Sequence, residues 1–253
     1  MGRTVAGVDG CKGGWLVAIT EQWPQMKPSL KVCPKFSDVI SETRSCSATV
    51  IDIPIGLPQS NSERRCDLQA RKAICDSRVP NAHSRVFRPP PRSALQFSDW
   101  QGFQRHISEL IHISPTKQAF DFSPKIKEVD DGMDPDLQRR ILEFHPEPTW
   151  KRIAGYTLQS KHNAAGLLER LNVLQKLGAN WILEFIDDPV MRKVALDDVL
   201  DAVVGLGVAD RIDGDFTPTD RTSETTTRVD QHRYPEGEME MDKEKDLRME
   251  IWF

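Results

Sequence analysis

Long apolar runs are missing from this sequence. Its 253 residues contain no stretch that approaches the roughly 18 apolar residues of a membrane-spanning helix. The N-terminus has neither the charged start nor the apolar core of a signal peptide. We therefore expect a cytoplasmic protein that does not contact a membrane.

Paired cysteines are also missing. The five cysteines are odd in number and include no Cys-x-x-Cys pair, so neither a disulfide framework nor a zinc site is indicated. Reduced thiols are the expected state, which agrees with a cytoplasmic location.

The sequence also lacks a strong excess of positive charge. The net charge of -4 argues against a protein that coats nucleic acid indiscriminately. Residues 213–253 hold 12 acidic and 6 basic residues, and we expect an acidic, flexible tail over residues 213–246. Basic side chains gather in residues 64–92, among them Arg65 and Arg71. They could bind phosphates, and a solvated helix face is an equally good interpretation.

The apolar segments predict an α/β fold. Strands are expected at residues 3–9, 15–19, 29–33, 49–53 and 141–144, and helices at residues 36–42, 160–178 (capped by Ser160) and 197–211. This order predicts a mixed five-stranded sheet (β-β-β-α-β-α-β-α) flanked by helices.

One domain is expected over residues 1–212, with an insertion of helices and loops at about 60–138. The insertion opens with Ser60-Asn61-Ser62-Glu63, which has the spacing of a helix capping box. The apolar segment 247–253 is expected to dock back onto the domain.

Four aspartates are candidate metal ligands. Asp9 ends one apolar strand, Asp52 lies within another, and Asp198 and Asp201 are three residues apart in a predicted helix. Residues at that spacing project from nearly the same face, about 60° apart. Carboxylates in apolar strands are costly unless a cation offsets them, and a divalent ion is a common offset. Turn formation by Asp9 and a favourable helix-dipole position for Asp198 are the simpler explanations.

Glu147 is a fifth candidate. It follows the last predicted strand in the stiff segment His145-Pro146-Glu147-Pro148, at a strand end where ligands usually collect. An exposed loop acid is the competing interpretation.

Seven segments resemble a known family, the one catalogued as domain of unknown function 429. They are 7–15 (GVDGCKGGW), 52–58 (DIPIGLP), 65–71 (RCDLQAR), 84–87 (SRVF), 125–130 (KIKEVD), 145–147 (HPE) and 197–202 (DDVLDA), and the closing segment 247–253 also fits. Members are classed as predicted ribonuclease-H-like nucleases. The resemblance implies a ribonuclease H fold with metal ligands from the first strand, the fourth strand and the last helix.

On this sequence those ligands are Asp9, Asp52 and the pair Asp198 and Asp201. The expected reaction is hydrolysis of phosphodiester bonds in DNA or RNA with two Mg²⁺ or Mn²⁺ ions, and Glu147 is a further candidate catalytic residue. Substrate contacts are expected from Lys12, Arg65 and Arg71. Gly205 and Gly207 depart from the pattern, because each costs a helix up to ~1 kcal/mol relative to alanine.

Two other functions remain open at this stage. The glycine-rich turn of residues 9–14 resembles a phosphate loop of the sugar-kinase and actin type, which would make the protein an ATP-binding phosphotransferase or ATPase. However, no second such hairpin appears in the sequence. The third possibility is a non-catalytic nucleic-acid-binding protein, whose function would survive replacement of Asp9 or Asp52 by asparagine.

Overall fold

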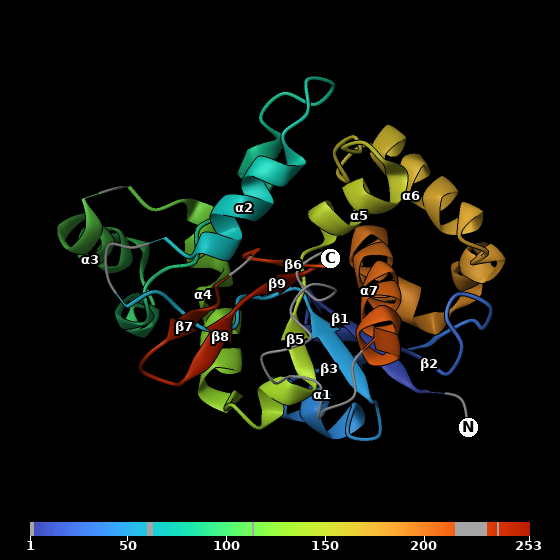
Figure 1. Cartoon of the computed structure of the whole chain (residues 1–253), viewed down its shortest axis with the longest axis horizontal. Helices are drawn as coiled ribbons and strands as arrows, with labels where there is room; N and C mark the ends of the chain where they lie inside the picture. The colour runs from blue at the N-terminus through green and yellow to red at the C-terminus, as the bar shows by residue number, and fades with distance from the viewer. Residues whose placement is uncertain (1–2, 60–62, 113, 216–231, 237) are drawn as a thin grey trace.

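The computed structural model describes the chain apart from residues 1–2, 60–62, 113, 216–231 and 237 (Figure 1). At its centre is a sheet of five strands. They are β1 (Val5–Cys11), β2 (Gly14–Thr20), β3 (Ser29–Cys33), β4 (Ala48–Ile51) and β5 (Ile141–Glu143). They lie in the order β3-β2-β1-β4-β5, with β2 antiparallel to both β1 and β3, and with β4 parallel to both β1 and β5. The expected mixed five-stranded α/β sheet is confirmed.

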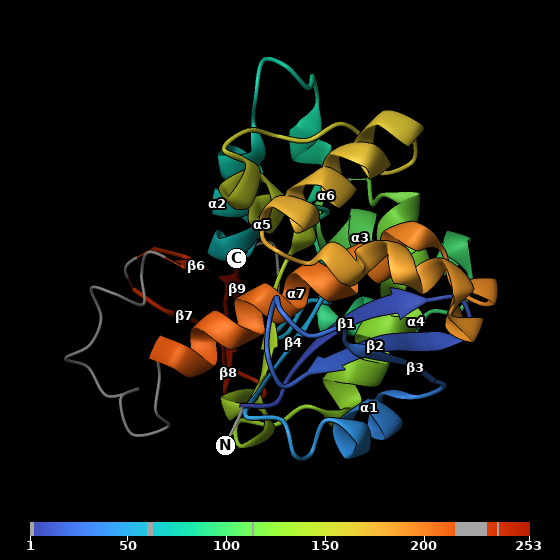
Figure 2. The ribbon, with the colours of Figure 1, turned by 90° about the vertical axis from the view of Figure 1, so that its right-hand side faces the viewer.

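Helices cover both faces of this sheet. The α-helices of the described ranges are α1 (Phe36–Glu42), α2 (Arg65–Ile74), α3 (Trp100–Ile111), α4 (Lys117–Gly132), α5 (Pro146–Ala154), α6 (Ala164–Lys176) and α7 (Leu196–Asp215). Short 3-10 helices are η1 (Ala82–Arg85), η2 (Arg92–Gln96), η3 (Leu137–Arg139), η4 (Asn180–Asp187) and η5 (Pro189–Arg192). Figure 2 shows α6 and α7 on one side of the sheet and α1 on the other. None of the helices in the described ranges combines the length and the apolar character needed to cross a membrane.

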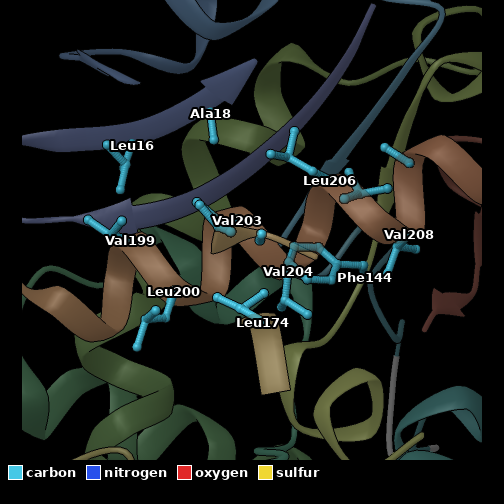
Figure 3. Close-up of a cluster of buried hydrophobic side chains, with 14 of the residues drawn as sticks. Leu16, Ala18, Phe144, Leu174, Val199, Leu200, Val203, Val204, Leu206 and Val208 are labelled. Carbon is cyan, nitrogen blue, oxygen red and sulfur yellow. The ribbon is translucent and has the colours of Figure 1, made fainter. Parts of the chain in front are cut away.

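The side chains of β2 point alternately into two hydrophobic layers, one on each face of the sheet. Leu16 and Ala18 belong to the layer that contains α7, as Figure 3 shows. Trp15 and Val17 belong to the opposite layer, with side chains of α1 and α4. Successive strand residues point to opposite faces, so this single strand supports both halves of the core.

The glycines of α7 are explained by close packing. A β-carbon on Gly205 would lie 2.9 Å from a ring carbon of Phe144, and one on Gly207 would lie 2.8 Å from the indole nitrogen of Trp23. Both distances are shorter than the contacts that real side chains make. Glycine is therefore found at these two positions of α7 despite its low helix propensity, because a larger side chain would not fit.

Part of the expected insertion belongs to the core. α4 lies within residues 60–138, yet its Ile126 and Val129 are fully buried in the layer beneath β1 and β2. α2 begins at Arg65, and Glu63 and Arg64 just before it are not helical, so the helix starts later than the capping-box spacing predicts. The expected cap residues Ser60, Asn61 and Ser62 lie outside the described residues.

The described residues that follow position 231 form short paired strands. They form two antiparallel pairs, β6 (Arg233–Tyr234) with β9 (Ile251–Trp252) and β7 (Glu240–Asp242) with β8 (Leu247–Met249).

The structure therefore differs from the flexible tail expected over residues 213–246. α7 continues to Asp215, and residues 216–231 lie outside the described ranges. Farther on, the buried Asp242 accepts a hydrogen bond from the Leu57 amide at 2.9 Å and pairs with Arg92. These partners satisfy a carboxylate within the segment that the sequence predicts to be flexible.

Candidate active site

Asp9 and Asp52 lie at the same end of two neighbouring parallel strands. Val8 of β1 is paired with Ile51, the last residue of β4. The amide of Asp52 then donates a hydrogen bond to the carbonyl of Val8 at 3.0 Å. This register places Asp9 and Asp52 at matching positions, so their side chains leave the same face of the sheet.

Two further aspartates come from α7, which packs most closely on β1. Asp201 is 1% exposed, and its Oδ1 accepts a hydrogen bond from the indole nitrogen of Trp150 at 2.9 Å. Asp198 lies one turn earlier and is half-buried. Both interact electrostatically with Asp9, so the four aspartates named by the sequence do come together.

Lys161 provides the positive charge within this cluster. It lies between α5 and α6, and its Nζ is 2.6 Å from Oδ2 of Asp201 and 3.8 Å from Asp197. Burial lowers the pKa of Lys161, but Asp201 and Asp9 outweigh that effect and raise it above its ordinary value. The ammonium group is therefore held in its charged form.

Lys161 compensates only part of the negative charge of the four aspartates. Burial raises the pKa of Asp9 well above its ordinary value, and repulsion from Asp52 raises it further. Burial also raises the pKa of Asp52 to about 8, although Lys161 opposes the rise. For Asp198, burial followed by repulsion from Asp197 raises the pKa to about 6. More negative charge is gathered here than one lysine can neutralise.

A cavity of about 460 Å³ opens at this cluster, a size typical of ligand-binding sites. Among its lining residues, those that matter for chemistry are Asp52, Asp198, Asp201, Lys161, Arg85, Phe87 and Phe122. The rings of Phe87 and Phe122 are stacked with centroids 5.6 Å apart. The cavity thus combines carboxylates, cations and an aromatic wall.

Glu147 also lines this cavity, but two arginines hold its carboxylate. Arg85 donates to one oxygen at 2.7 Å, and the fully buried Arg170 donates to the other at 2.6 Å. The sequence placed Glu147 in a stiff segment after a strand; in the structure it is the second residue of α5 and is 8% exposed. Its position near the site agrees with the expectation, and its contacts are those of a residue that positions Arg85.

A second buried ion-pair network supports the strand ends. Arg64 is 1% exposed and donates to both carboxylate oxygens of Glu143 and to both of Asp67, at 2.7 to 2.9 Å. Glu143 also accepts a hydrogen bond from the Ile55 amide at 2.7 Å. The network ties β5 to the segment after β4, which carries Asp52.

The three residues expected to bind substrate are not brought to the cavity. Lys12 is exposed in the turn between β1 and β2. Arg65 donates from its backbone amide to Glu240 at 2.6 Å. Arg71 donates to the carbonyl of Val86 at 2.7 Å and pairs with Glu63. None of the three is among the residues that line the cavity.

Lys161, Arg64 and Arg85 line the cavity and were not among the residues predicted to bind substrate. Arg85 lies in the SRVF segment, so the family motif was a usable signal. Lys161 lies in a short polar stretch between two helices, and nothing in its sequence neighbourhood marks it as buried against aspartates.

The donor chemistry of the cluster fits divalent cations. Carboxylate oxygens are the ligands that Mg²⁺ prefers in proteins. Among the described residues, Oδ1 of Asp9 accepts a hydrogen bond from the Gly10 amide, but no hydrogen bond or ion pair is found for its Oδ2 or for the carboxylate of Asp52. Within the same described ranges, no three His, Cys, Asp or Glu side chains already form a ligand set, and the Lys161 ammonium lies against Asp201.

The fold and the site define an α/β protein with a buried carboxylate cluster at one end of a mixed sheet. Residues 7–223 match the family described as protein of unknown function (DUF429), and the chain belongs to that family. Segment 247–253, which also carried the resemblance, lies beyond the matched range. No curated protein and no solved structure matches the chain.

Proposed function

We propose that this protein is a metal-dependent nuclease that hydrolyses phosphodiester bonds of nucleic acid. The observation that carries the proposal is the meeting of Asp9, Asp52, Asp198 and Asp201 in one cluster with too little positive charge. Buried carboxylates of this kind are costly unless a proton or a cation offsets their charge.

The strands and the helix that position the four aspartates support a ribonuclease H-like fold for this proposal. The aspartates come from β1, from the residue after β4, and from α7, which are the elements that the family resemblance implied. Similarity of element order and ligand position is the reason for preferring this reaction to others on an α/β scaffold.

The chain's own residues would bind and orient the reactants. Bound Mg²⁺ or Mn²⁺, with two ions expected, would activate water and stabilise the leaving oxygen. Asp9 would hold the ions from β1, Asp52 from the residue after β4, and Asp201 from a helix where Trp150 fixes one of its oxygens. Arg85, held by Glu147 at 2.7 Å, would contact a phosphate at the cavity wall.

The aromatic wall supports nucleic acid as the substrate. The stacked rings of Phe87 and Phe122 are half-buried and line the cavity that Asp52 also lines. Base–aromatic stacking contributes about 1–3 kcal/mol per base and tolerates any sequence. We infer that an unstacked base lies against this wall while its phosphate faces the carboxylates.

A cytoplasmic location belongs to the same proposal. All five cysteines are free, and four of them are buried. Free thiols are usual for proteins of a reducing compartment.

The test is incubation of the purified protein with labelled single-stranded and duplex DNA and RNA, with Mg²⁺, Mn²⁺ or EDTA. We expect metal-dependent cleavage that is at least about 100-fold slower in Asp52→Asn, because losing even an indirect metal contact costs about 10–100-fold. Asp136→Asn is the matched control, since its side chain is 89% exposed; it should cleave at the wild-type rate.

Three results would contradict the proposal. Absence of cleavage of every substrate would do so directly. Binding and turnover of ATP in its place would favour the phosphotransferase alternative. Nucleic-acid binding that Asp52→Asn leaves unchanged, without cleavage, would favour a non-catalytic binding protein.

A further inference from the structure

The ammonium group of Lys161 lies against Asp201, one of the candidate metal ligands. Its Nζ is 2.6 Å from Oδ2 of Asp201 and 3.8 Å from Asp197. The other oxygen of Asp201 is engaged by Trp150 at 2.9 Å. With Trp150 on one oxygen and Lys161 on the other, this carboxylate is occupied in the structure.

Asp9 and Asp52 are in the opposite situation. Among the described residues, Oδ2 of Asp9 and the carboxylate of Asp52 have neither a hydrogen bond nor an ion pair. Asp9 is nevertheless 6% exposed. A buried carboxylate oxygen without a partner is costly, so this side of the cluster is ready to accept a cation.

We propose that Lys161 holds the place of the second metal ion. The free protein binds one divalent ion at Asp9 and Asp52, and a second ion binds at Asp201 only when the Lys161 side chain leaves. This inference rests on the metal binding in the proposed function, and it makes Lys161 the residue that decides how many ions the site holds.

The Lys161 side chain can move away from Asp201 without a change in the backbone of the site. Lys161 lies in the segment between α5 and α6, and its side chain is 27% exposed. On one side the segment is anchored by Thr157, whose hydroxyl donates to the Ile74 carbonyl at 2.8 Å. On the other side Asn163 caps α6. The long lysine side chain can therefore rotate towards the cavity while its backbone and Asp201 stay in place.

The experiment is titration calorimetry with MnCl₂ alone on the wild-type protein and on single variants. We expect one bound ion per chain in the wild type and in Lys161→Arg, which keeps the charge. We expect two ions in Lys161→Met and in Lys161→Gln, which remove it. Lys151→Met is the control, because that lysine donates to the Cys75 carbonyl outside the cluster at 2.9 Å; it should bind one ion.

Thermal melting provides a second measurement on the same variants. Without Lys161 the aspartates repel each other uncompensated, so the neutral variants should melt at a lower temperature than the wild type in EDTA. Mn²⁺ should then raise their melting temperature by more than it raises that of the wild type. The Lys161→Met and Lys161→Gln variants differ in the polarity of the new side chain. The test needs only one of the two variants to fold.

The inference is overturned if the wild type binds two ions or none, or if the neutral variants bind one. Its failure is distinct from failure of the nuclease proposal. Two ions in the wild type together with cleavage would remove only the role of Lys161. One ion in the wild type and two in the neutral variants, without cleavage of any nucleic acid, would remove only the nuclease.

Discussion

Gly7 of β1 and Ala202 of α7 are in direct backbone contact. A β-carbon placed on Gly7 would lie 2.0 Å from the carbonyl oxygen of Ala202. Only glycine permits this approach, and Ala202 is the neighbour of Asp201. The missing side chain at position 7 therefore brings the helix that carries Asp201 against the strand that carries Asp9.

Gly7→Ala should destabilise the protein strongly. Overpacking usually costs about 1–3 kcal/mol and occasionally more, and here the clash is with backbone, so we expect about 3 kcal/mol or more in urea denaturation. The control is Gly10→Ala on the same strand, where the nearest atom is a flexible carbon of Lys125 at 3.1 Å. Equal, small losses for the two variants would show that α7 and β1 are not held so closely.

Arg64→Met should lower the free energy of unfolding by about 3–5 kcal/mol, because it leaves Asp67 and Glu143 buried without their cation. Its neighbour Arg65 is exposed, and Arg65→Met should change stability by less than about 0.5 kcal/mol. Chemical denaturation of the two variants measures the difference. A stable Arg64→Met protein would mean that the network contributes little to the fold.

Glu147→Gln should separate positioning from catalysis. The variant loses the charge that pairs with Arg85 and with the fully buried Arg170, so we expect a stability loss of about 3 kcal/mol. Cleavage should fall less than in Asp52→Asn, because an amide can still accept hydrogen bonds from arginine. Unchanged stability with a loss of cleavage equal to that of Asp52→Asn would instead assign Glu147 a direct catalytic role.

His145 should make the protein less stable in mild acid. Burial lowers the pKa of His145 to about 4, and its Nδ1 accepts a hydrogen bond from the Glu147 amide at 3.2 Å. The unfolded residue titrates near 6.5, so the unfolded chain binds more protons between these two values. The free energy of unfolding therefore falls as the pH drops from about 6.5 to 4, by on the order of 3 kcal/mol for this residue.

Urea denaturation at pH 7 and pH 4.5, with EDTA present, measures this effect. His145→Gln, which has no titratable ring, should lose less stability on acidification than the wild type. The exposed His83 provides the control variant His83→Gln, which should behave like the wild type. An identical pH dependence for His145→Gln would show that the ring is not buried in its neutral form.

Local patterns were enough to predict the sheet and part of the site. The alternation in residues 15–19 and the apolar runs that contain Asp9 and Asp52 are properties of neighbouring residues, so they are visible in the chain itself. α5 was missed because His145-Pro146-Glu147-Pro148 looks like a strand end, whereas proline in the first turn of a helix is well tolerated.

Partners distant in sequence could not be predicted in this way. Lys161 and Asp201 are 40 residues apart, and Arg64 and Glu143 are 79 apart. Arg65 and Arg71, which were predicted to bind substrate, lie in the same basic stretch as Arg64 and Arg85. Of the four, only Arg64 and Arg85 line the cavity, and this depends on how α2 and η1 pack against the rest of the fold.

The sequence by itself determined the five strands of the central sheet and the candidate carboxylates, because both follow from local periodicity and from the cost of placing charge in an apolar strand. Tertiary structure alone decided the charge balance of the site. The pairing of strands and the approach of α7 at Gly7 bring Asp9, Asp52 and Asp201 together, and the segment after α5 then places one lysine among them. Electrostatic energy depends on distance through space, and distance through space is what the fold creates.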